Sequence, residues 1–113
     1  MACVELSHLV EILDATKSSN SNRAKSIRDV ICSSLDKISS SLSNPSNVFP
    51  YEVDGGDGKY FMDDANIPSL LSLPVLGYMS AAHPVYQATR AYVQSPKNPF
   101  WFSGTSLYFM LHT

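Results

Sequence analysis

Length, composition and charge bound what this chain can be. It has 113 residues, which corresponds to one domain or to part of one. Only 16% of the residues are charged and the net charge is -2, so the chain offers no basic face to neutralise phosphates. The composition therefore argues against a nucleic-acid partner.

Membrane insertion and targeting are not indicated either. No stretch approaches the roughly 20 uninterrupted apolar residues that a spanning helix requires. The N-terminus lacks a basic region, and Glu5, His8 and Glu11 interrupt its apolar residues, so we expect no signal peptide in this chain. The localisation of the protein stays unknown.

Two amphipathic helices are predicted in the first part of the chain. Apolar residues recur at helical spacing over 3–15 and again over 23–42, while the Ser and Asn residues of 18–22 favour a loop. Two helices joined by a short polar loop form an antiparallel hairpin. Each apolar stripe is wide enough to require further packing partners.

The two cysteines are expected to be free. Cys3 and Cys32 are too few for a disulfide framework. Both fall on the apolar faces of the predicted helices, where cysteine behaves as a small apolar residue. We therefore expect two buried thiols.

A β-hairpin is predicted near residues 48–62. Aromatic and β-branched residues alternate with polar residues on the first side of Asp54–Gly58, and Tyr60-Phe61-Met62 follows it. Three glycines in the central segment supply positive φ angles. The predicted fold class is therefore mainly α, with one short β-hairpin.

Helical structure is expected again from Asn66. Pro68 fits a first helical turn, whereas Pro74 cannot lie inside a helix without cost. We therefore expect a short turn over 68–72 and a new start over 73–78.

A further helix is predicted over 85–94, opened by His83-Pro84, with His83 making a contact at the helix start. Asn98-Pro99 is a predicted turn that leads into the aromatic residues 100–102. The stripe of this helix that we expect to be buried consists of Tyr86, Thr89, Tyr92 and Val93.

The adjacent carboxylates Asp63 and Asp64 are the first candidates for chemistry. Paired carboxylates serve glycoside hydrolysis, metal binding and recognition of sugar hydroxyls. The acid and base of a glycosidase must face each other across the bond, about 5 to 9.5 Å apart, whereas neighbouring side chains diverge. At most one of the two is expected to face a substrate. The alternative is that Asp64 or Asn66 caps a helix that begins at Ile67.

A metal site is not predicted. Asp54, Asp57, Asp63 and Asp64 do not have the spacing of an EF-hand loop. The three histidines His8, His83 and His112 are not spaced as a set of ligands, and no cofactor is expected.

Three segments carry a resemblance to a known family. They resemble glycoside hydrolase family 125, the metal-independent exo-α-1,6-mannosidases, and further short pieces over 84–90, 95–99 and 102–104 are similar to the same family in the same order. The segments are Tyr51-Glu52-Val53-Asp54-Gly55, Met62-Asp63-Asp64-Ala65-Asn66-Ile67-Pro68-Ser69-Leu70-Leu71-Ser72-Leu73-Pro74 and Gly77-Tyr78.

The resemblance implies a segment of an (α/α)6 barrel that binds a terminal α-1,6-linked mannose and hydrolyses it with inversion and without a metal. A mannose-containing glycan is then the partner, and the missing barrel helices are the packing partners. The substrate-binding candidates are Asp63, Asp64 and Asn66, with Tyr78 or Trp101 as a wall of the pocket.

The resemblance also has limits. The family's general acid comes from an Arg-Pro-Ser-Asp-Asp-Ala-like motif and its base from a His-Glu-Ser-Phe-like motif, and this sequence contains neither. We expect residues 1–104 to be part of the catalytic domain and 105–113 to be a divergent tail, an artefact of the gene model. The alternative is an inactive remnant or a weak carbohydrate-binding fragment.

Overall fold

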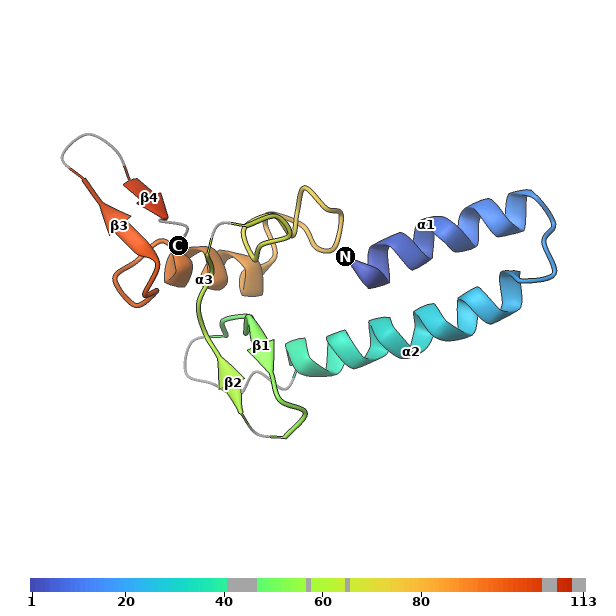
Figure 1. Cartoon of the computed structure of the whole chain (residues 1–113), viewed down its shortest axis with the longest axis horizontal. Helices are drawn as coiled ribbons and strands as arrows, with labels where there is room; N and C mark the ends of the chain where they lie inside the picture. Colours follow the sequence, from blue (N-terminus) through green and yellow to red (C-terminus); the bar gives the residue numbers. More distant parts are fainter. Residues whose placement is uncertain (41–46, 57, 65, 105–107, 111–113) are drawn as a thin grey trace.

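Figure 1 shows the computed structural model of the chain, which describes residues 1–40, 47–56, 58–64, 66–104 and 108–110. Within these residues, three helices and two pairs of short strands follow in the order α1, α2, β1, β2, α3, β3, β4. The molecule measures 56 × 32 × 27 Å and its radius of gyration is 16.5 Å. A compact chain of this length has a radius of gyration of about 13 Å, so this one is extended.

The extended shape comes from the first two helices. Helix α1 (Ala2–Ala15) and helix α2 (Ser21–Ser40) pack antiparallel and project away from the remaining elements (Figure 1). Val10 and Ala24 are buried between them, as the helical spacing of the apolar residues predicts. The predicted helical hairpin is therefore confirmed, and the predicted end at residue 42 lies outside the described residues.

Polar contacts hold the closed end of this hairpin. The carboxylate of Asp14, near the end of α1, accepts hydrogen bonds from the Ser21 hydroxyl and, at 2.9 Å, from the ammonium of Lys25. The Ser21 hydrogen bond and then the one from Lys25 lower the pKa of the Asp14 carboxyl. Asp14 therefore ties the end of α1 to the first turn of α2.

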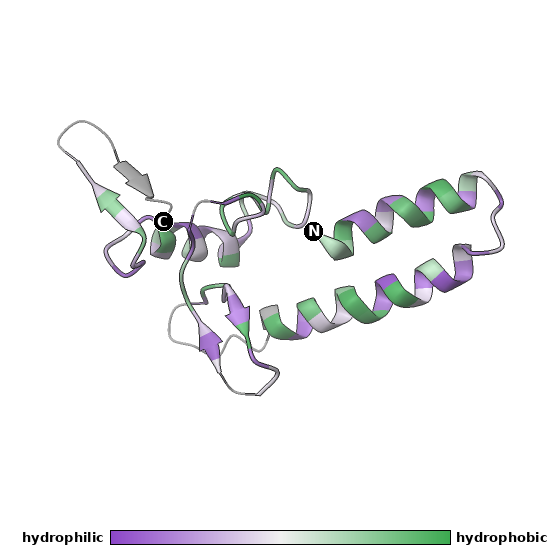
Figure 2. Cartoon of the chain, viewed as in Figure 1, coloured by the Kyte–Doolittle hydropathy of each residue, from purple (hydrophilic) through white to green (hydrophobic). Residues whose placement is uncertain are grey.

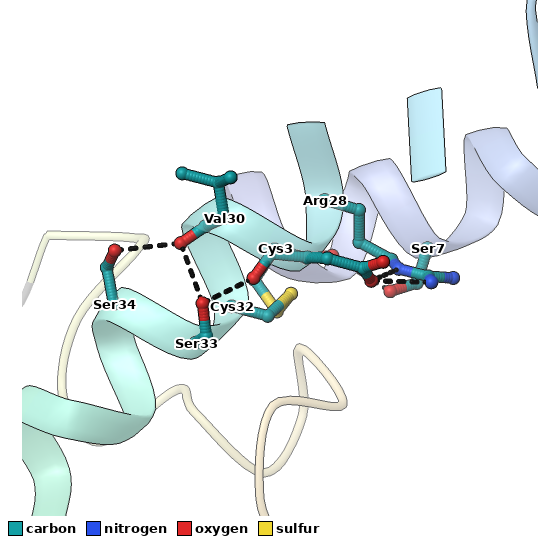
Figure 3. Close-up of a disulfide and its surroundings, with 8 residues drawn as sticks. Cys3, Ser7, Arg28, Val30, Cys32, Ser33 and Ser34 are labelled. Carbon is teal, nitrogen blue, oxygen red and sulfur yellow. Dashed lines mark hydrogen bonds and ion pairs between the residues drawn. A yellow bond between two sulfur atoms is a disulfide. The ribbon is translucent and has the colours of Figure 1, made fainter. Parts of the chain in front are cut away.

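A disulfide closes the opposite half of the hairpin, so the prediction of two free thiols is wrong. Cys3 and Cys32 are bonded to each other across α1 and α2 (Figure 3), with their Cα atoms 5.2 Å apart. Both residues do lie on the facing sides of the two helices, where they are partly buried. Spacing along the sequence places each cysteine on a helix face, but it does not tell which residues of the two helices lie opposite each other.

Several apolar residues of α1 and α2 are exposed. Ile12 is 60% exposed and Val30 is 66% exposed, and apolar residues recur along both helices in Figure 2. An open groove between the helices is lined in part by Leu9, Leu13 and Ile27. That these surfaces pack against further helices stays a prediction.

The predicted β-hairpin is present. Strand β1 (Glu52–Val53) pairs antiparallel with strand β2 (Lys59–Tyr60). The carboxylate of Asp54 accepts hydrogen bonds from the N–H groups of Gly56 and Gly58, and Gly55 adopts a φ of 81°. A short side-chain acceptor followed by glycines therefore builds the turn, as this kind of segment predicts.

A second strand pair was not predicted. Strand β3 (Trp101–Ser103) pairs antiparallel with strand β4 (Tyr108–Met110). The sequence showed aromatic residues after Asn98-Pro99 but no repeated pattern from which a pairing could be inferred. Pairing across a loop is a non-local interaction, which short aromatic runs alone do not reveal.

The helix expected to begin near Ile67 is absent, because the described residues between Asn66 and Tyr78 form bends and turns. The Tyr78 N–H donates to the Leu73 carbonyl at 3.0 Å, and the Gly77 N–H donates to the Pro74 carbonyl at 3.1 Å. This pair of bonds is typical of a helix C-terminus, and Gly77 has the positive φ, 76°, that it requires. Of the new helical start expected over 73–78, only this last turn forms.

Helix α3 (Pro84–Val93) confirms the last helix predicted. His83 precedes it, and its Nδ1 accepts a hydrogen bond from the Val85 N–H at 3.3 Å, so the expected contact at the helix start is present. Val93 is buried with Phe49 and Leu70 in a small core beside the helix. This core carries the segment that contains the two adjacent aspartates. In the described part of the chain, no helix is long and apolar enough to cross a membrane.

Candidate functional site

Asp63 is a completely buried carboxylate. Its exposed fraction is 0%, and its Oδ2 accepts a hydrogen bond from the Leu71 N–H at 3.3 Å. Among the described residues, its Oδ1 has no hydrogen-bond partner. Burial raises the pKa of the Asp63 carboxyl, and the N–H groups of Leu71, Leu70 and Asp64 oppose this shift in part. A buried acid with an unsatisfied oxygen is costly in a purely structural role.

The backbone of Asp63 is held by one buried side chain, that of Asn98, which is 1% exposed. Its Oδ1 accepts a hydrogen bond from the Asp63 N–H at 3.2 Å, and its Nδ2 donates to the Asp63 carbonyl at 2.9 Å. The backbone N–H and carbonyl of Asp63 are therefore both bonded by the side-chain amide of Asn98, which is 35 positions away in the sequence.

Helix α3 anchors the surrounding turns. The Tyr86 hydroxyl donates to the Leu71 carbonyl at 3.1 Å, so the residue whose N–H donates to Asp63 is itself held. The Thr89 hydroxyl accepts a hydrogen bond from the Phe49 N–H at 2.8 Å and donates to the Val85 carbonyl at 2.7 Å. Of the predicted stripe, Tyr86, Thr89 and Val93 are buried and Tyr92 is half-buried.

Asp64 and Asn66 form a local turn at the surface side of the same segment. The Asp64 carboxylate accepts from the Asn66 N–H at 3.2 Å and from its side-chain amide at 3.0 Å. Asp64 is half-buried and Asn66 is exposed. Because no helix begins at Ile67, the prediction that one of these residues caps such a helix is wrong. The carboxylate instead stabilises a turn around its own segment.

Tyr51 lies within the electrostatic reach of both aspartates. Burial, and then the negative charges of Asp64 and Asp63, raise the pKa of the Tyr51 hydroxyl. Its N–H donates to the Tyr60 carbonyl at 2.9 Å, which places it beside the β1–β2 hairpin. Asn98 was not selected as a candidate from the sequence. The only local signal for Asn98 was its place in the turn before Pro99.

The two aromatic candidates occupy different surroundings. Tyr78 packs edge to face against Phe49, with ring centroids 6.1 Å apart, and its pKa is raised by burial and then by the charge of Asp36. Trp101 is half-buried at the start of β3, and its N–H donates to the Asn98 carbonyl at 3.0 Å. Trp101 is thus linked through Asn98 to Asp63, whereas Tyr78 belongs to the core beneath the segment.

A metal ion would need several His, Cys, Asp or Glu side chains close together. Across the residues that the structure describes, no cluster of three or more His, Cys, Asp or Glu side chains has a suitable arrangement. The Asp54 carboxylate is instead engaged by the N–H groups of its own turn. The carboxylates of Asp63 and Asp64 accept hydrogen bonds from the Leu71 N–H and from Asn66, respectively.

The segment with the two aspartates thus lies on a small core beside α3. Comparison with known proteins identifies the family of the chain. The family model of the metal-independent alpha-mannosidase (GH125) matches residues 1–109. The chain therefore belongs to this family of glycoside hydrolases, and the resemblance noted in the sequence is confirmed.

Two relatives support the assignment. The meiotically up-regulated gene 157 protein of Schizosaccharomyces pombe is 40% identical over 108 residues, which are 92% of this chain and 21% of that protein. A Streptococcus pneumoniae protein, described as a metal-independent alpha mannosidase in a non-productive complex with alpha-1,6-mannobiose, is 33% identical with a TM-score of 0.87. This match covers 99% of our chain and 28% of the solved one.

The chain spans only a small part of both relatives. This chain spans about a fifth of the yeast relative and little more than a quarter of the solved structure. The solved relative is an (α/α)6 barrel, so the fold prediction of a mainly helical barrel segment is confirmed. The division into residues 1–104 and a tail over 105–113 stays a prediction.

Proposed function

We propose that this chain supplies part of the sugar-binding wall of an inverting α-mannosidase that acts on terminal α-1,6-linked mannose. The observation that carries the proposal is the family match over residues 1–109, which includes the buried and polar segment around Asp63 and Asp64. The solved relative, with a TM-score of 0.87, holds alpha-1,6-mannobiose, which supports the choice of ligand.

Asp64 and Asn66 are the proposed direct contacts with the sugar. Asp64 is half-buried, Asn66 is exposed, and between them they present a carboxylate and an amide. A carboxylate accepts hydrogen bonds from sugar hydroxyls, and an amide both donates and accepts. On binding, mannose hydroxyls would take the place of some of the contacts that the two residues now make with each other.

Asp63 is proposed to act from behind this surface. Its carboxylate is fully buried in the described structure, and its Oδ1 has no described hydrogen-bond partner, so it supports the segment that carries Asp64. Trp101 and Tyr78 are the proposed apolar walls, because an aromatic face stacks on a sugar ring while its edge stays polar.

Inversion requires an acid and a base on opposite faces of the sugar, about 6.5 to 9.5 Å apart. Asp63 and Asp64 are sequence neighbours with different surroundings, and they do not provide this arrangement. The resemblance places acid and base in motifs that this sequence lacks. We therefore expect the 113-residue chain to bind the disaccharide weakly and not to cleave it, which is the second candidate function.

An exchange of segments tests the enzymatic proposal. Residues 1–104 replace the matching segment of the Streptococcus pneumoniae protein, and hydrolysis of α-1,6-mannobiose is followed by proton NMR, which also shows the anomer released first. We expect activity with release of the β-anomer, and a loss of at least about 100-fold for Asp64→Ala. Asp29→Ala, on the exposed side of α2, is the matched control and should retain activity. A folded hybrid that retains activity in Asp64→Ala contradicts the assigned contact.

A further inference from the structure

We propose that Asn98 is a positioning residue of this sugar site, which holds the backbone of Asp63 so that the Asp63 and Asp64 side chains are fixed on different sides of their segment. The inference rests on the proposed function for its consequence in sugar binding, but its structural content stands on the described hydrogen bonds alone.

The side-chain amide of Asn98 uses its full capacity. Beyond its two bonds to the Asp63 backbone, its Nδ2 donates to the Val93 carbonyl at 3.1 Å and its Oδ1 accepts from the Phe100 N–H at 3.3 Å. A primary amide has two donor hydrogens and two acceptor lone pairs, so these four bonds saturate it. Asn98 is 1% exposed, and its bonds to Asp63 and Val93 are buried, while the bond to Phe100 is partly buried.

The four bonds join three parts of the fold. Val93 is the last residue of α3, Phe100 lies directly before β3, and Asp63 belongs to the segment after β2. The Asp63 backbone is thereby fixed on both of its polar groups, much as a neighbouring strand would fix it. Asp63 is buried and Asp64 is half-buried, so fixing the backbone between them keeps the first side chain inside and the second near the surface.

A second tie acts on the Asp63 side chain but not on its backbone. The Leu71 N–H donates to its carboxylate, and the Tyr86 hydroxyl holds Leu71 from α3. The Leu71 bond fixes the position of the Asp63 carboxylate, whereas the Asn98 bonds fix the position of the Asp63 backbone. Without Asn98, the segment loses the constraint that sets the direction of Asp64.

The identity of the residue at position 98 follows from its contacts. An aspartate there would keep an acceptor for the Asp63 and Phe100 N–H groups, but it would turn a carboxylate oxygen toward the Asp63 and Val93 carbonyls, where the amide now donates. An alanine would remove these bonds from the buried Asp63 N–H, Asp63 carbonyl and Val93 carbonyl and from the partly buried Phe100 N–H. Only an amide of this length supplies both the acceptor oxygen for the two N–H groups and the donor NH₂ group for the two carbonyls.

The test uses the isotope-labelled 113-residue chain and its Asn98→Ala variant. Amide hydrogen exchange is measured at Asp63 and Phe100, and the Asp63 carboxyl is titrated by carbon-13 NMR. We expect exchange at both amides to become about tenfold faster in the variant. We also expect the Asp63 carboxyl to titrate at lower pH, because water then reaches it while Asp64 and Tyr51 remain its titratable neighbours.

Thr89→Val is the matched control. Thr89 is 0% exposed and bonds the Phe49 N–H, so its loss destabilises the same support without touching Asp63. Exchange at Phe49 should quicken, whereas the two Asn98-bonded amides and the Asp63 titration should stay as in the wild type. Equal effects of both variants on the Asp63 titration would show that Asn98 acts through general stability only, and would overturn the proposal.

α-1,6-Mannobiose is then added, and the shift of the Asp64 amide is followed. Asn98→Ala should weaken this binding by about tenfold, and Thr89→Val should leave it within a factor of two. If the wild-type chain shows no shift at Asp64, the proposed sugar contact fails while the exchange and titration data still decide the role of Asn98. If Asn98→Ala does not fold, the wild type decides: rapid exchange of the Asn98 side-chain hydrogens and of the Asp63 amide would overturn the inference.

Discussion

The disulfide between α1 and α2 should account for most of the stability of the helical hairpin. The perturbation is the double substitution Cys3→Ser and Cys32→Ser, which removes the bond and changes little else in size. The bond closes a loop with a sequence separation of 29 residues. In the chain-entropy description, a closed loop of this length stabilises the folded state by about 3.5 kcal/mol.

Little else within the hairpin offsets such a loss. Val10 and Ala24 are its buried apolar residues in the described structure, while Ile12 and Val30 are mostly exposed. At about 3.5 kcal/mol, the ratio of open to closed hairpin rises about 400-fold on removal of the bond. Since α1 and α2 project away from the other elements, this opening is local and spares α3 (Figure 1).

Hydrogen exchange followed by mass spectrometry measures this opening. Peptides from Ala2–Ala15 and Ser21–Ser40 should exchange about 400-fold faster in the double variant than in the oxidised wild type, while Pro84–Val93 keeps its protection. A reductant should accelerate exchange in the wild type and leave the double variant unchanged. Exchange rates of the hairpin peptides within threefold of each other in the oxidised and double-variant chains would refute the reasoning.

Three further changes have defined outcomes. Burial raises the pKa of the Asp63 carboxyl, so its contribution to stability is present below about pH 3.9 and is lost as the pH rises through the raised pKa. In urea unfolding, Asp63→Asn should therefore gain stability relative to the wild type between about pH 3 and pH 7. A difference that does not change with pH would contradict this. Gly77→Ala should lower the free energy of unfolding by about 1 kcal/mol, because φ is 76°, and Gly77→Asn by less; equal losses in thermal denaturation would point to another cause. Ile12→Ser with Val30→Ser should reduce binding of an apolar fluorescent dye, and unchanged fluorescence would show that the dye binds elsewhere.

The elements that could be predicted from the sequence are those set by local interactions. Helical spacing of apolar residues is a property of ten to twenty consecutive positions, and it predicted α1, α2 and α3. The turn between β1 and β2 follows from Asp54 and its glycines, and the start of α3 follows from His83-Pro84. In each case the hydrogen bonds that build the element join residues only two to four positions apart.

The features that were missed depend on residues far apart in sequence. Cys3 and Cys32 are bonded because of the register of two helices, and the bonds of Asn98 to Asp63 span 35 positions. The helix expected near Ile67 failed for a different reason. The hydroxyls of Ser69 and Ser72 accept hydrogen bonds from each other's backbone N–H groups, at 3.2 and 2.8 Å, as at the start of a helix, but Pro74 follows two residues later and lacks the N–H group that a longer helix needs.

The adjacency of Asp63 and Asp64 can now be interpreted physically. As a sequence pattern, the pair suggested two equivalent carboxylates of which one faces a substrate. In the structure the two differ in every respect that matters for chemistry, because one is buried with a raised pKa and the other lies half-buried in a surface turn with Asn66. On the proposed role of Asn98, that difference originates in the backbone of Asp63, to which the Asn98 side chain is bonded from the turn after α3. A site of this kind depends less on the two carboxylates than on the amide that directs them, and exchanging Asn98 tests this more directly than removing either acid.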